Sequence, residues 1–218
     1  MRKGLSRRSA IIWGVAVVLG VTAGFEWWMG RSLFGPDGKP SLWEGDIWSS
    51  ECSQRLADAY SFSHIGHGLL FFGLLWLFAR RVPLRFRFLI AVLVEAGWEM
   101  LENSPIIINR YREATMALGY SGDSILNSLS DILMMCIGFL LAWRLPLWAS
   151  VMLFVAMEVG CALWVRDNLT LNVIMLVHPV EAIKAWQMPI PSPTLAMGFC
   201  FSAFCGSLPG ACRSGSVS

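Results

Sequence analysis

Three glutamates lie one helical turn apart in the segment EAGWEMLENSP, which ends an apolar run that begins near Phe86. Glu95, Glu99 and Glu102 are spaced i, i+4 and i+7, so on a helix they share one face. An ionised carboxylate deep in a membrane costs roughly 2.5–3.5 kcal/mol on insertion scales, and such groups face the interior of a bundle or water. We therefore expect this stripe to face other polar side chains around a cavity.

Two further apolar segments carry polar residues that match this stripe. His64 and His67 are spaced i, i+3 near the start of one segment. Another segment begins with Asp123, Asn127 and Asp131, which form an i, i+4, i+8 face on a helix. If the three helices pack together, these residues converge at one depth of the membrane.

The first hypothesis for this cluster is a divalent metal site, with His64, His67 and Glu99 as ligands. Imidazole and carboxylate ligands suit Zn²⁺ or Mn²⁺. An open position on the metal could hold an activated water for hydrolysis of a lipid-linked ester or phosphoester, with Glu99, Glu102, His64 and Asp131 as catalytic groups. The sequence contains no HExxH pattern, so the hypothesis depends on convergence of the helices.

A second hypothesis is an anion site for a lipid headgroup or another phosphate-bearing ligand. A helix predicted to start at Gly-Asp-Ser would point its N-terminus outward, and helix N-termini favour anions. Arginine side chains suit phosphates because the guanidinium forms paired hydrogen bonds. The predicted ligand-binding residues are Arg110, Arg112, Asp123, Ser124 and Asn127.

The third interpretation gives the polar cluster a purely structural role. Glu99 and Glu102 would pair with Arg110 or Arg112, the histidines would bond carboxylates, and Ser124 or Asp123 would cap a helix. The protein would then be a non-catalytic membrane protein whose polar cluster fixes helix packing. The sequence leaves open whether the protein is an enzyme.

Hydropathy predicts the helices that must position these residues. We expect five spanning helices, over about 10–30, 62–79, 86–103, 123–144 and 147–165, in an all-α transmembrane bundle. The first run also fits a cleaved signal peptide. The arginine cluster at 80–87 predicts a cytoplasmic side, which places the N-terminus in the cytoplasm and the polar cluster outside. The stretches 31–60 and 105–122 are then outer loops.

The C-terminal part is expected to add one short element and a tail. The segment 166–187 is short for a span, so we favour an amphipathic or re-entrant helix, with a sixth crossing as the alternative. We expect one integral membrane domain over 1–187. Residues 188–218 are rich in Pro, Ser and Gly and are expected to be poorly ordered.

Composition supports a membrane protein and excludes other classes. The 218 residues are 56% hydrophobic and only 15% charged, whereas soluble domains have about 25% charged residues. The formal net charge of +2 and the lack of a basic stripe argue against a nucleic-acid partner. The six cysteines form no CxxC pair and no zinc-ribbon spacing. The lipid bilayer is therefore the expected partner.

Four blocks of the sequence carry a resemblance to a known family: YSFSHIGHG, EAGWEMLENSPIIINRYREAT, LGYSGDSILNSLSD and TLNVIMLVHPVEAIKAWQ. They resemble a bacterial inner-membrane family of uncharacterised function, catalogued as domain of unknown function 2585 and mostly alphaproteobacterial. The similarity covers about residues 10–187. It implies a multi-pass protein of the bacterial inner membrane and supplies no established reaction.

A more distant similarity is to the VanZ-like membrane proteins, which share a layout of His, Glu-x-x-x-Glu, Arg, Asp, Asn and Gly. In this chain the layout falls on His64, Glu95, Glu99, Arg110 or Arg112, Asp123, Asn127 and Gly138. VanZ is associated with glycopeptide resistance at the cell surface. Asp131 is an additional acid outside that layout. Together these observations favour binding or processing of an envelope lipid or cell-wall precursor.

Overall fold

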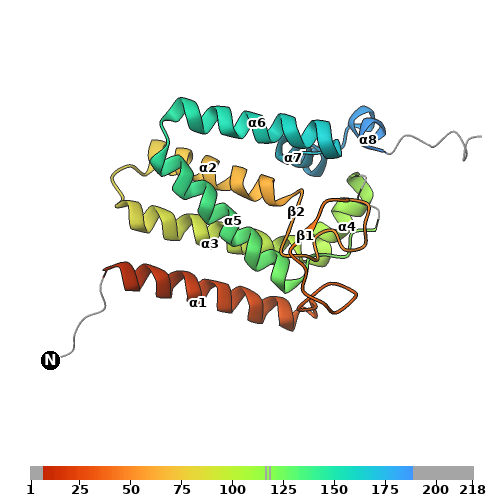
Figure 1. Cartoon of the computed structure of the whole chain (residues 1–218), viewed down its shortest axis with the longest axis horizontal. Helices are drawn as coiled ribbons and strands as arrows, with labels where there is room; N and C mark the ends of the chain where they lie inside the picture. Colours follow the sequence, from red (N-terminus) through yellow and green to blue (C-terminus); the bar gives the residue numbers. More distant parts are fainter. Residues whose placement is uncertain (1–6, 116, 118, 189–218) are drawn as a thin grey trace, which may run out of the picture. The chain divides into compact units, whose positions relative to one another are not determined.

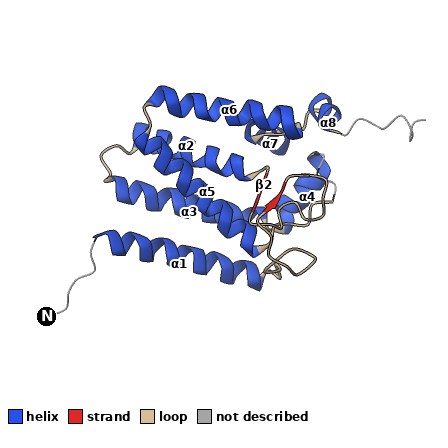
Figure 2. Ribbon diagram, viewed as in Figure 1, coloured by secondary structure: helices blue, strands red, loops and turns tan. Residues whose placement is uncertain are grey.

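The computed structural model describes residues 7–115, 117 and 119–188, which are mostly helical with almost no strand (Figures 1 and 2). The helices are α1 (Arg7–Trp28), α2 (Ser61–Phe78), α3 (Leu84–Glu102), α4 (Pro105–Ala114), α5 (Ile125–Arg144), α6 (Leu147–Val165), α7 (Leu169–Val177) and α8 (Glu181–Gln187). Two-residue strands β1 (Trp43–Glu44) and β2 (Ala57–Asp58) pair in parallel. The predicted all-α bundle is confirmed.

Four of these helices, α1, α2, α5 and α6, are long and apolar enough to cross a membrane. The predicted third span, α3, has 19 residues, the same length as α6, but it carries two arginines and three glutamates. It contacts α1, α2 and α5, so its polar face has protein beside it (Figure 1). Its length allows a fifth crossing, although its composition is not that of an isolated span.

The closest helix pair is α2 with α5, and two glycines make this contact. A Cβ atom on Gly68 would collide with the backbone of Met135 and Phe139, and one on Gly138 would collide with the backbone of Ile65. Small residues at such crossings let two backbones approach closely in membrane proteins. This contact sets the position of the two histidines on α2 relative to Asp131 on α5.

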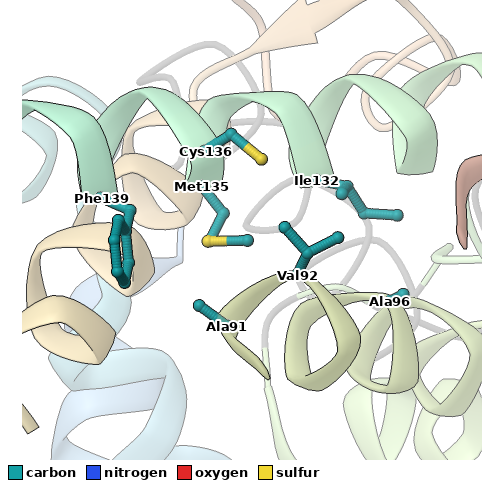
Figure 3. Close-up of a cluster of buried hydrophobic side chains, with 7 residues drawn as sticks. All are labelled: Ala91, Val92, Ala96, Ile132, Met135, Cys136 and Phe139. Carbon is teal, nitrogen blue, oxygen red and sulfur yellow. The ribbon is translucent and has the colours of Figure 1, made fainter. Parts of the chain in front are cut away.

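An apolar core lies between α3 and α5, beside the polar residues. Ala91, Val92 and Ala96 of α3 face Ile132, Met135, Cys136 and Phe139 of α5 (Figure 3). Val92, Ile132 and Met135 have no exposed surface. Because Glu95 and Glu99 lie on the next turns of α3, this core closes one side of the polar cluster.

The stretch 31–60 is held against the helices by specific contacts. Trp43 stacks on Trp164 of α6, with ring centroids 5.9 Å apart. Asp58 Oδ1 accepts the backbone N–H of Tyr60 at 2.8 Å and of Ser61 at 3.2 Å, which satisfies free donors at the start of α2. The predicted outer loop is therefore an ordered cover beside the site.

Two segments differ from the sequence-based expectation. The expected loop over 105–122 contains the helix α4, which begins at Pro105, a residue favoured in the first turn of a helix. The segment 166–187 forms two short helices, and the nine residues of α7 are roughly 14 Å long, about half of a bilayer core. This length argues against a sixth crossing. The predicted poorly ordered tail lies outside the described residues, apart from Met188.

Glu158 of α6 attaches the start of α7 to α6 by hydrogen bonds. Its carboxylate oxygens accept the backbone N–H groups of Leu169 at 3.1 Å and Thr170 at 3.0 Å. A carboxylate at a helix N-terminus satisfies free donors and complements the helix dipole. Glu158 is thus a helix-capping residue that fixes α7 to α6.

Candidate functional site

Three helices bring the predicted polar residues together. His64 and His67 lie one turn apart in the first half of α2, and Glu95 and Glu99 lie one turn apart in the second half of α3. Asp131 lies in the second turn of α5. The start of α2, the end of α3 and the start of α5 lie at the same end of the bundle as α4 and the two strands (Figure 1).

Glu95 is the residue on which both histidines converge. Its Oε1 atom lies 2.7 Å from His64 Nδ1 and 2.9 Å from His67 Nδ1. Glu95 has no exposed surface, and His64 is 8% exposed. One nitrogen or oxygen from each of the three side chains lies within 4.8 Å of the others, a spacing that suits a bound metal ion. We call this set the histidine cluster.

The other edge of His64 faces Asp131. His64 Nε2 lies 3.8 Å from Asp131 Oδ2, and Ser61 donates a hydrogen bond to Asp131 Oδ1 at 3.2 Å. A carboxylate placed in this way can orient an imidazole and raise its basicity. Asp131 is therefore positioned to act through His64.

A second group of acids adjoins the histidine cluster. Glu99, Glu102 and Asp123 each place a carboxylate oxygen within 4.8 Å of the others. Among the described residues, neither oxygen of Glu99 has a hydrogen-bond partner. His64 Nδ1 is 3.4 Å from Glu99 Oε1, but its nearest partner is Glu95. We call this set the carboxylate cluster.

Tyrosines from α4 and the segment before α5 complete the carboxylate cluster. Tyr111 hydrogen-bonds Glu102, and Tyr120 donates to Asp123 Oδ1 at 2.9 Å. Burial raises the pKa of Asp123 to about 7, despite the hydrogen bond from Tyr120. Burial likewise raises the pKa values of Tyr111 and Tyr120. Both tyrosines therefore remain neutral donors at physiological pH.

The other predicted ligand-binding residues lie at the start of α5, where they form hydrogen bonds within the protein. Ser124 is the N-cap of α5 and accepts the backbone N–H of Asn127 at 3.2 Å. The side chain of Asn127 donates to the carbonyl of Arg55 at 2.9 Å. Asn103 Oδ1 accepts the backbone N–H of Asp123 at 2.7 Å. These contacts fix the position of Asp123.

Neither predicted arginine pairs with the acids. Arg110 Nε donates to the carbonyl of Leu176 in α7 at 2.8 Å. Arg112 Nε donates to the carbonyl of Tyr120. Both guanidiniums thus tie α4 to neighbouring backbone, and the two side chains do not line the cavity at this site.

A cavity of about 610 Å³ connects the polar residues to an apolar wall. Its polar lining includes His64, His67, Glu95, Glu102, Asp123 and Asp131. Its apolar lining includes Phe71, Val94 and Trp98 of α2 and α3, and Leu169, Val173 and Leu176 of α7. The cavity therefore offers both charged and hydrophobic side chains to a ligand.

The sequence places Glu95 in the glutamate stripe but predicts Glu99, not Glu95, as the metal ligand. In the structure Glu95 is the glutamate closest to the two histidines. The i, i+3 spacing of His64 and His67 showed that they share a face, but not which turn of α3 lies opposite. Tyr111 and Tyr120 were missed because their stretch was expected to be a loop. A signal was available for Tyr120, which precedes Asp123 by three residues.

Comparison with known proteins gives the family. The sequence pattern described as "Protein of unknown function (DUF2585)" matches residues 26–189. A UPF0314 protein of Paracoccus denitrificans is 48% identical over 182 residues, covering 84% of this chain and 94% of that protein. One from Sphingopyxis alaskensis is 50% identical over 188 residues, covering 84% and 97%.

A third relative, UPF0314 protein Atu8092 of Agrobacterium fabrum, is 52% identical over 163 residues, covering 75% of this chain and 82% of that protein. No solved structure matches the chain. The similarity to VanZ-like proteins stays a prediction. The extent of the match and the identity to these relatives show that the chain belongs to the DUF2585 family, whose curated relatives are named UPF0314 proteins.

Proposed function

We propose that this protein is a metal-dependent membrane enzyme that hydrolyses an ester or phosphoester bond in the polar end of an envelope lipid or lipid-linked cell-wall precursor. The observation that carries the proposal is the histidine cluster, which lies in the wall of a cavity lined by both acidic and apolar side chains.

The ligand types favour zinc, with manganese as the alternative. Two imidazoles and one carboxylate are a common protein set for catalytic zinc, in which a fourth position remains for water. His64, His67 and Glu95 supply this set. A metal bound there would polarise a substrate oxygen and lower the pKa of a bound water.

Nearby carboxylates can accept and donate the protons of such a reaction. Glu102 lines the same cavity, and Glu99 lies beside His64. In hydrolysis, water forms a bond to the carbonyl carbon or phosphorus while the bond to the leaving alcohol breaks. A carboxylate can take the water proton and return it to the alcohol. Asp131 would hold His64 in the orientation that leaves it free to bind metal.

The shape of the site favours an amphiphilic substrate. The apolar lining from α2, α3 and α7 can accept hydrocarbon, while the histidine and acidic side chains of the lining can face a headgroup. Those carboxylates repel a bare phosphate. A divalent cation at the histidine cluster would reverse this repulsion, so the metal and an anionic headgroup are expected to bind together.

The proposed location is the bacterial inner membrane, with several crossings and a cytoplasmic N-terminus. Support comes from Arg80, Arg81, Arg85 and Arg87, which lie around the α2–α3 connection at the end opposite the site. In this orientation the site opens in the outer half of the bilayer.

A non-catalytic role in helix packing is the second candidate. It is favoured by the hydrogen bonds of both histidines to Glu95, which satisfy these buried groups without a metal. In that case the cluster fixes α2 against α3, and no ligand is needed.

Metal content of the purified protein separates the two candidates. We expect near-stoichiometric zinc or manganese in the wild type in detergent, and at least a tenfold weaker metal affinity in His67→Gln and Glu95→Gln. Glu158→Gln, which alters a carboxylate that caps α7, is the matched control. Wild-type protein that carries no metal and takes none up would support the packing role. Hydrolysis of lipid-linked esters by the metal-loaded protein would then test the reaction.

A further inference from the structure

The carboxylate cluster gathers negative charge and potential ligand oxygens. A metal at the histidine cluster would not account for either. Glu99, Glu102 and Asp123 are three acids whose oxygens lie within 4.8 Å of one another. Glu99 has no exposed surface, and neither of its oxygens has a hydrogen-bond partner among the described residues. A buried carboxylate without partners is costly, so the arrangement needs a compensating group.

The partners of the other two acids are neutral. Glu102 is bonded by Tyr111 and Trp98, and Asp123 by Tyr120 and Ser53. The nearby cation, Arg31, donates to the carbonyl of Ser121 rather than to a carboxylate. The cluster therefore presents converging oxygens that no lysine or arginine side chain of the described residues pairs with.

We propose that Glu99, Glu102 and Asp123 bind a second divalent cation, Mg²⁺ or Mn²⁺, directly beside the histidine cluster. An all-oxygen set of carboxylates suits these hard cations rather than zinc. The oxygens of Glu99, which accept no hydrogen bond from the described residues, supply ligand atoms for this cation.

The backbone of α3 places the two sites next to each other. Glu95 belongs to the histidine cluster. Glu99 and Glu102 follow on the next two turns of the same face and belong to the carboxylate cluster. His64 touches both, with Nδ1 at 2.7 Å from Glu95 and 3.4 Å from Glu99. Paired cations in adjacent sites clamp the attacking and leaving oxygens of a phosphoester. The catalytic use of the second cation rests on the proposed function. Binding of the second cation does not depend on that function.

Manganese titration of the metal-stripped, full-length protein in detergent tests the inference. Free Mn²⁺ is followed by its electron paramagnetic resonance signal, and bound manganese is counted after equilibrium dialysis. We expect two bound Mn²⁺ per wild-type chain. Glu99→Gln is expected to lose one of them, with an affinity at least tenfold weaker at that site. Glu102→Gln provides the same test if Glu99→Gln does not fold.

The variants distinguish failure of this inference from failure of the proposed function. His67→Gln should lose the other Mn²⁺ and keep the one at the carboxylate cluster, and Glu158→Gln should keep both. If Glu99→Gln and Glu102→Gln bind as many Mn²⁺ ions as the wild type, the second site is wrong. If the carboxylate variants lose an ion and His67→Gln loses none, the second site stands and the proposed histidine metal site fails.

Discussion

Glu95 and Glu99 occupy successive turns of one helix, yet their surroundings differ. Glu95 accepts hydrogen bonds from two histidines, whereas Glu99 has no hydrogen-bond partner among the described residues. Both side chains are fully buried. The difference arises because both histidines hydrogen-bond Glu95, whereas only His64 comes near Glu99, with Nδ1 3.4 Å from Oε1. It is the reason for assigning the two glutamates to different clusters.

Asp167 offers a residue-scale test of burial outside the spanning helices. It accepts hydrogen bonds from Tyr60 at 3.2 Å and Gln187 at 2.9 Å, and burial raises its pKa to about 6. An unfolded aspartate ionises near pH 4, so the folded protein holds the proton more tightly. The stability contributed by protonated Asp167 is complete below about pH 4 and is lost as the pH rises through about 6.

We therefore expect the wild type to lose up to about 3 kcal/mol of unfolding free energy, relative to Asp167→Asn, between about pH 4 and pH 7. Unfolding of both proteins in mixed detergent micelles across this range measures the difference. A difference that does not change with pH would show that Asp167 keeps an ordinary pKa in the folded protein.

At the scale of elements, the crossing of α2 and α5 is the contact on which the site depends. Gly68 and Gly138 allow the two backbones to approach, and the histidines lie on the turn of α2 beside this contact. Any separation of the helices would move His64 away from Asp131. Packing of the two elements and geometry of the site are therefore coupled.

We predict that Gly68→Ala destabilises the protein by about 1–3 kcal/mol, because the added methyl group meets the backbone of α5. Gly73→Ala on the same helix is the control, since no atom lies within 4 Å of its added methyl group, and its stability should be unchanged or up to about 1 kcal/mol higher. Detergent unfolding measures both. Equal effects of the two substitutions would contradict close packing at Gly68.

At the scale of the whole molecule, the acidic side chains of the described residues gather at one end of the helices. Acids and histidines lie where α2 and α5 begin and α3 ends, together with Arg110 and Arg112 of α4, whereas the arginines at 80–87 and Arg144 lie at the opposite end, where the described part of the chain has no acids. Arginine-rich connections remain on the cytoplasmic side of a membrane. The distribution predicts one orientation of the bundle in the bilayer.

That orientation is testable by cysteine labelling in intact cells. Ser121 and Arg81 are exposed and lie at opposite ends of the helices. We expect Ser121→Cys to react with an impermeant thiol reagent from the periplasm, and Arg81→Cys to react only after the inner membrane is opened. The unsubstituted protein gives the background from native cysteines. The reverse pattern would invert the proposed topology.

Apolar runs and residue spacing along the chain were enough to predict the long helices and most polar residues of the site. Long apolar runs fixed the helices because a membrane requires internally satisfied backbone, and the predicted fifth helix matches α6 residue for residue. Spacing showed which side chains share a face of a helix, since that depends only on 3.6 residues per turn. Within the part of the chain that the structure describes, four helices carry the apolar signal of a span, and α3 does not, because it contains two arginines and three glutamates.

Which helix faces meet, and at which turn, depends on how the helices pack in three dimensions. The offset between helices decides that Glu95 pairs with both histidines, that Glu99 has no hydrogen-bond partner among the described residues, and that Arg110 and Arg112 bond backbone carbonyls. The offset between α2 and α5 is set by the two glycines, whose contact joins residues about 70 positions apart. Local spacing carries no information about such an offset, which is why the residues of the site could be predicted but not their grouping.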